Sequence, residues 1–152
     1  MLNQLDNGTN TMIEQPTPPA SFFDATGAIA ADLVLRSNRP IGDEYRQRAG
    51  ELGLAVSTAV SFPSVVVAGD ATSLADIEAV GPGYPLRGSL RTSDRPFGES
   101  RPETGIPQPG EAWADAKLLA RLDAAPGVEL RVGSAKVKVS RVLDYRPDQG
   151  WS

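Results

Sequence analysis

Carboxylates are the main candidates for acid–base chemistry in this sequence, because its 152 residues include no histidine and no cysteine. Four carboxylates lie in or beside one glycine- and proline-rich stretch: Asp94, Glu99, Glu103 and Glu111. If two of them converged in a cleft, they could act as general acid and general base. Four arginines lie in the same stretch: Arg87, Arg91, Arg95 and Arg101. This mixture of charges predicts a solvated loop with surface ion pairs, so a carboxylate-dependent hydrolase is only our third hypothesis.

The absence of histidine and cysteine excludes several other kinds of chemistry. Imidazole and thiolate are the usual ligands of structural zinc and the usual partners or nucleophiles in covalent catalysis at neutral pH. A zinc site of that kind, a Ser-His-Asp triad, a catalytic cysteine and a disulfide are therefore impossible. We expect no catalytic residue, no metal ligand and no cofactor, and we expect that the chain is not an enzyme.

The stretch 81–88 has the glycine content of a phosphate-binding loop but lacks its other features. Such a loop needs free backbone N–H groups at the start of a helix. Two positions of this stretch are proline, which has no N–H, and no helix is predicted to follow. A rigid turn is the expected structure. In and after this turn, Tyr84, Arg87 and Phe97 are the residues that we expect to contact a partner from an exposed loop.

Composition and charge argue against three classes of protein: helical bundles, nucleic-acid-binding proteins and chains that themselves span a membrane. The chain is 40% hydrophobic, and its 15 glycines and 13 prolines argue against a simple helical bundle. Its net charge of −4 gives no positive field for a phosphate backbone, so nucleic acid is not an expected partner. No apolar run approaches the roughly 18 to 20 residues that span a bilayer, so the chain alone is expected to be soluble. Its length predicts one domain.

The first half of the pattern predicts two strands around one helix. A short apolar run at 32–36, an amphipathic helix at 41–52 and an alternating strand at 54–62 form a βαβ unit. The two strands of such a unit are expected to be parallel in one sheet. Tyr45 is expected to face the core from the helix.

The middle of the chain predicts a meander and then a long loop. Pro63 is expected to form a hairpin between the preceding strand and another at 64–68. The segment 73–80 fits both a helix and a strand, and we favour a strand because the connection is short. Residues 81–110 show no sustained period, which predicts a long ordered loop.

The last part predicts a strand, a helix and a hairpin. A brief strand at 111–114 includes Trp113 as a core residue, and Asp115 is expected to cap the helix that follows. The alternation at 128–142 predicts a β-hairpin with a two-residue turn and one buried face. The predicted fold class is α+β, with a small mixed sheet containing the βαβ unit, two short helices, a long Gly/Pro-rich loop and a C-terminal β-hairpin.

One segment has a pattern that is specific enough to indicate a family. The sequence AVGPGYPLRG at 79–88 is similar to an A-V-G-x-G-Y-P-L-R-G block, and similar segments at 30–40, 60–64 and 109–115 stand in the matching order. Together they resemble the periplasmic core of FtsX-like ABC transporter permeases of the MacB type, and within that group the YbbP-like permeases. The resemblance covers about residues 23 to 145.

The resemblance implies a place and a role for the chain. The polar, proline-rich residues 1–22 are expected to form a disordered or unrelated tail. The resemblance implies a partial extracytoplasmic domain at 23–145, and a tail is expected at 146–152. In this family a transmembrane helix precedes the region, and further periplasmic core and transmembrane helices follow it. We therefore expect a fragment of an inner-membrane permease whose present part is periplasmic. A separate ATPase subunit, reached through the missing membrane part, would hydrolyse ATP, while this domain engages a periplasmic protein or exported substrate and relays conformational change.

Two further expectations concern partners. In a fragment, the C-terminal hairpin with Val137 and Val139 would leave an uncovered edge, which predicts self-association of the chain. The main alternative function is a free-standing extracytoplasmic module that binds a peptide or carbohydrate through the loop at 81–110.

Overall fold

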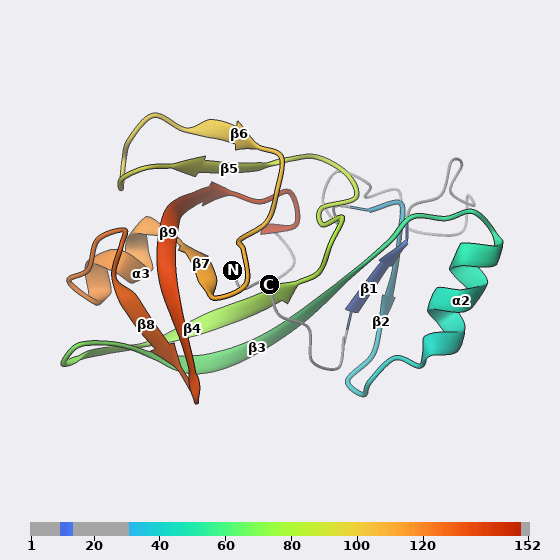
Figure 1. Cartoon of the computed structure of the whole chain (residues 1–152), viewed down its shortest axis with the longest axis horizontal. Coiled ribbons are helices and arrows are strands. Elements are labelled where there is room, and N and C mark those ends of the chain that lie inside the picture. The colour runs from blue at the N-terminus through green and yellow to red at the C-terminus, as the bar shows by residue number, and fades with distance from the viewer. Residues whose placement is uncertain (1–9, 14–30, 150–152) are drawn as a thin grey trace.

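The computed structural model of this chain describes residues 10–13 and 31–149. In chain order the described elements are β1 (Asn10–Ile13), β2 (Leu33–Arg36), α2 (Asp43–Glu51), β3 (Val56–Ala68), β4 (Ala71–Val80), β5 (Leu90–Ser93), β6 (Arg101–Glu103), β7 (Glu111–Ala114), α3 (Ala116–Arg121), β8 (Glu129–Val132) and β9 (Ala135–Tyr145) (Figure 1). These strands form one nine-stranded sheet with two helices beside it, which agrees with the expected α+β class. Within these residues no helix is long and apolar enough to cross a membrane.

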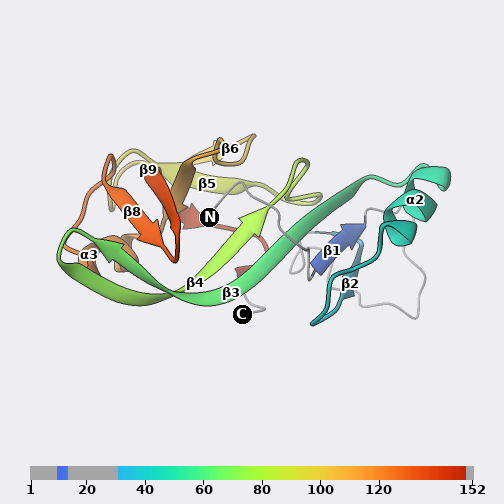
Figure 2. The ribbon, with the colours of Figure 1, turned by 60° about the horizontal axis from the view of Figure 1, so that its bottom comes forward.

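The long strand β3 organises the sheet. It runs from the end of the molecule that carries α2 to the end that carries α3, and it bends along its length (Figure 2). The strand order is β2-β1-β3-β8-β9-β5-β6, with β4 also paired to β3 and β7 also paired to β9. Each pairing is antiparallel except that of β7 with β9, which is parallel.

The expected βαβ unit is present with one strand inserted. Strands β2 and β3 are each antiparallel to β1, so they are parallel to one another with β1 between them. Residues 10–13 therefore differ from the disordered tail expected at 1–22, because they pair with a strand on both sides. The rest of the segment 1–22 lies outside the described residues.

The hairpin expected at Pro63 is wrong, because β3 continues through this residue. Ala68 and Ala71 face each other across a two-residue turn that begins at Gly69, whose φ of 56° suits such a turn. Antiparallel pairs alternate outward from that closing pair, so the nitrogen of Pro63 faces away from β4. On that side β3 pairs with β1 only up to Ala59 and with β8 only from Val66 onward. A missing N–H at residue 63 therefore breaks no pairing.

The C-terminal hairpin is confirmed, but its predicted edge is not. Strands β8 and β9 join through a two-residue turn in which Gly133 has a φ of 60°. β8 also pairs with β3, and β9 also pairs with β5 and β7. Val137 and Val139 are buried, at 7% and 0% exposure. The predicted self-association therefore loses its basis, because neighbouring strands of the same chain cover both sides of this hairpin.

The segment 81–110 is more regular than expected. It contains the β5–β6 hairpin, and β5 pairs with β9, so this stretch is part of the sheet. Its strands are short, and Pro102 lies in β6, the last strand of the order, where proline is tolerated. Strand β4, favoured over a helix, is confirmed.

Two clusters of buried side chains form the core. One cluster lies between the sheet and α3, whose start Asp115 caps by accepting a hydrogen bond from the backbone N–H of Leu118 at 2.7 Å, as expected. The other contains Trp113, also as expected, together with Tyr84 and Leu90. Tyr45 is instead 49% exposed, because α2 buries only Ala49. The end of the molecule that carries α2 is thus the less tightly packed end.

Candidate functional site

The block at 79–88 leads out of β4 and carries two of the three predicted contact residues. Tyr84 was expected on an exposed loop, but it is buried at 4% exposure. Its hydroxyl lies 2.8 Å from both carboxylate oxygens of Asp148 and donates to this group. Burial raises the pKa of Tyr84 far above its usual value, and the Asp148 carboxylate raises it further. Tyr84 is therefore a permanent neutral donor that holds the chain at residue 148.

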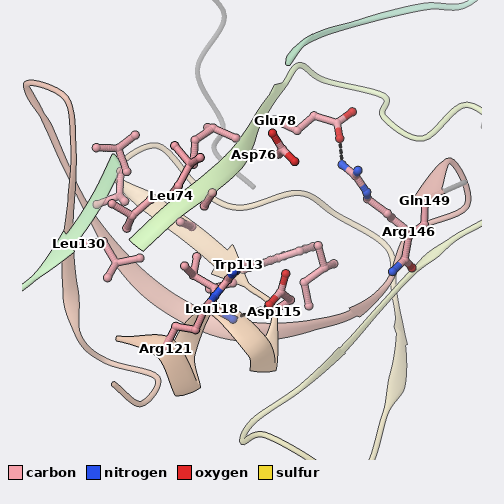
Figure 3. A pocket seen from close by; sticks show the side chains of 18 of the residues that line it. Leu74, Asp76, Glu78, Trp113, Asp115, Leu118, Arg121, Leu130, Arg146 and Gln149 are labelled. Carbon is pink, nitrogen blue, oxygen red and sulfur yellow. Dashed lines mark hydrogen bonds and ion pairs between the residues drawn. The ribbon is translucent and has the colours of Figure 1, made fainter. Parts of the chain in front are cut away.

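A shared arginine extends this contact to β4. Arg146 forms an ion pair with Glu78 (Figure 3). It forms a second one, at 3.7 Å, with Asp148. Both acidic residues are buried at 8% exposure, and one guanidinium lies between them. The tail expected at 146–152 is thus packed against the domain as far as Asp148, and residues 150–152 lie outside the described residues.

The glycine that ends the block is required by close packing. Gly88 has a φ of 74°, a backbone conformation that residues with a Cβ atom adopt only at a cost in free energy. A Cβ added there would lie 3.0 Å from the Cβ of Pro147. A larger residue at position 88 would therefore be strained and would require Pro147 to shift.

Arg87 makes the second contact, to the segment that precedes β2. Its Nε and Nη2 atoms donate to the two carboxylate oxygens of Asp32, at 3.1 Å and 2.9 Å. Asp32 is only 4% exposed, whereas the Arg87 side chain is 40% exposed. Two-point contacts of this kind fix both the position and the orientation of the carboxylate. Tyr84 and Arg87, three positions apart, thus tie Asp148 and Asp32 to one turn, and we call this pair of contacts the double tie.

Phe97 lies apart from the double tie. As expected, it is exposed, at 95%, and it stands at the tip of the β5–β6 hairpin. Its φ of 58° is unusual for an aromatic residue, and the turn is closed by the N–H of Gly98, which donates to the carbonyl of Arg95 at 3.0 Å. The structure therefore does not bring the three predicted contact residues into one site. It exposes only Phe97 fully.

Two of the four loop carboxylates, Asp94 and Glu103, form ion pairs, as expected. Asp94 contacts Arg101 at 2.5 Å and Arg141 at 3.2 Å, and Glu103 contacts Arg141 at 3.4 Å. The side chain of Asp94 is 69% exposed, so solvent screens these pairs. Of the four loop carboxylates, Glu103 lines a hollow beside the turn at 83–89, and none of the four lines the groove described below. These four carboxylates are therefore not gathered in either of those two hollows.

The larger hollow is a groove that sequence reasoning missed. It has a volume of about 380 Å³ and lies between β4 on one wall and β7 and α3 on the other (Figure 3). The apolar side chains that line it, which we call its floor, include Val66, Leu130 and Val137. Charged side chains also line it: four acidic ones, Asp76, Glu78, Asp115 and Asp144, and two basic ones, Arg121 and Arg146. The curl of the sheet brings these segments together, and no local motif in the sequence indicates it.

Comparison with known proteins relates the chain to a transporter component. It is 30% identical over 124 residues to the "Uncharacterized ABC transporter permease YbbP" of Escherichia coli (strain K12). The match covers 82% of this chain, and the chain spans about 14% of the length of that permease. No family model matches, and no solved structure matches. The similarity supports the expected relationship to ABC transporter permeases at that general level.

Proposed function

We propose that this chain is a non-catalytic extracytoplasmic part of an FtsX-like export permease with a MacB-type periplasmic core. In this proposal the parent permease sits in the inner membrane, and a separate ATPase subunit hydrolyses ATP. The domain engages a periplasmic protein or an exported substrate and relays conformational change. The observation that carries the proposal is the similarity to an ABC transporter permease over 82% of the chain.

The double tie supports the relay part of the proposal. A domain that transmits motion needs its two ends coupled through rigid contacts rather than through a flexible linker. Asp32 and Asp148 are held by residues of one turn, and Asp32 and Tyr84 are both buried. A displacement of the chain at Asp32 or at Asp148 would therefore act on the same turn.

Labelling of an engineered cysteine tests the extracytoplasmic placement. The chain has no cysteine, so Ser134→Cys in the exposed β8–β9 turn gives this chain a single reactive thiol. The variant chain would replace the matching region of the E. coli permease, with the unsubstituted chimera as the control. A membrane-impermeant maleimide should label the variant when only the outer membrane is permeabilised. Labelling that needs disruption of the inner membrane would contradict the proposal.

A further inference from the structure

One edge of β4 has no strand paired with it among the described residues. β4 pairs with β3 from Ala71 to Val80, and its other edge faces the groove. Because Ala68 and Ala71 close the turn, the main-chain groups that point away from β3 belong to every second residue. Of these alternate residues, Leu74, Asp76 and Glu78 line the groove. An unpaired edge of this kind can add a further strand.

The groove beside this edge suits an extended chain with an apolar side. Its floor is apolar, and the far wall carries Trp113 and Leu118 (Figure 3). A strand that paired with β4 would place alternate side chains toward the floor. The same alternation would direct its other side chains away from the floor.

The charged side chains of the groove indicate the charge of the partner strand that would bind there. Asp76 on β4 and Asp115 at the start of α3 stand on opposite walls (Figure 3). Glu78 is already paired with Arg146, whereas no ion pair is found for Asp76 within residues 31–149. A basic side chain between Asp76 and Asp115 would complement both. A second copy of β4 fits poorly, because antiparallel pairing would set its acidic residues against these.

We propose that the edge of β4 that faces the groove binds an extended segment of a partner polypeptide as an added strand, and that apolar and basic residues alternate in this segment. The main-chain groups of residues 74, 76 and 78 supply the pairing, and Asp76 with Asp115 selects the basic side chain. The inference deepens the proposed function by giving the chemistry of a partner, and it rests on that function only for its biological setting.

Peptide binding to the purified chain tests this inference separately from the placement in a permease. The probe is a short peptide in which valine and lysine alternate, and the control peptide has glutamate in place of lysine. We expect the lysine peptide to bind saturably and to protect the amides of residues 74, 76 and 78 from hydrogen exchange. Failure of the lysine peptide to bind, protection of amides elsewhere only, or dimerisation of the chain through β4 would overturn the inference.

Two pairs of variants separate edge binding from general effects. Asp76→Lys should weaken binding of the lysine peptide by about tenfold and favour the glutamate peptide, whereas Asp70→Lys in the β3–β4 turn should not. Leu74→Pro removes the main-chain N–H of residue 74, which faces the groove, and breaks no hydrogen bond to β3. This variant should therefore abolish peptide binding. Leu74→Ala keeps that N–H and should retain peptide binding. Equal effects within either pair would refute strand addition, provided that thermal melting shows each variant folded.

Discussion

Arg87 holds the carboxylate of Asp32 at two points, with Nε 3.1 Å from Oδ1 and Nη2 2.9 Å from Oδ2. Asp32 is buried and precedes β2, whereas Arg87 belongs to the block at 79–88. The contact therefore joins segments that are far apart in the sequence. It accounts for the arginine of the block as a structural residue, where an exposed contact was expected.

Removing this guanidinium should destabilise the domain. We expect Arg87→Met to lower the free energy of unfolding by about 2 kcal/mol, because the buried Asp32 carboxylate loses two charged hydrogen bonds. Arg48→Met is the control, since the Arg48–Glu51 pair is exposed at 69% and 64% and should contribute less than about 0.5 kcal/mol. Urea denaturation measures both. Equal losses in the two variants would show that the Arg87 contact is no stronger than a surface pair.

The raised pKa of Tyr84 predicts a loss of stability in alkali. The unfolded chain releases the tyrosine proton near pH 10, whereas the folded chain keeps it to a higher pH. Above pH 10 the folded state therefore binds more protons, and stability should fall by up to about 1.4 kcal/mol per pH unit. Denaturation at pH 9, 10 and 11 should show this slope in Tyr45→Phe but a smaller one in Tyr84→Phe. The same slope in both variants would remove Tyr84 as its cause.

The backbone conformation of Phe97 should lower the stability of the folded chain. A left-handed conformation costs a residue with a Cβ roughly 1 kcal/mol, and glycine avoids most of this cost. We expect Phe97→Gly to be more stable than Phe97→Ala by about 1 kcal/mol in urea denaturation, with its φ of 58° as the reason. If the exposed ring serves partner contact, both variants should lose that binding equally. A glycine variant less stable than the alanine variant would show that the left-handed φ is not a source of strain.

Local patterns predicted the parts of the fold that depend on neighbouring residues. The Asp115 cap, the Gly133 turn and the alternation of β9 were visible in the sequence because each depends on residues close to it in the chain. The continuity of β3 through Pro63 was not, because it depends on which neighbours pair with β3 on the side where the N–H is missing.

The candidate sites were harder to predict, for a related reason. Tyr84 and Arg87 looked exposed because their partners, Asp148 and Asp32, lie 64 and 55 residues away in the sequence. The groove needed the curl of the sheet to bring β4 to α3. Phe97 was predicted correctly as exposed, since the turn that presents it is local.

Hydrogen exchange in the Arg87→Met variant tests most directly whether the double tie couples the segment that contains Asp32 to the segment 146–149. If the block at 79–88 transmits strain, loss of the Asp32 contact should speed amide exchange in β2 and also in the segment 146–149, which contacts Tyr84 rather than Arg87. Faster exchange in both segments, with β8 unchanged, is the result that we predict. Faster exchange confined to β2 would contradict the coupling and, with it, the relay role.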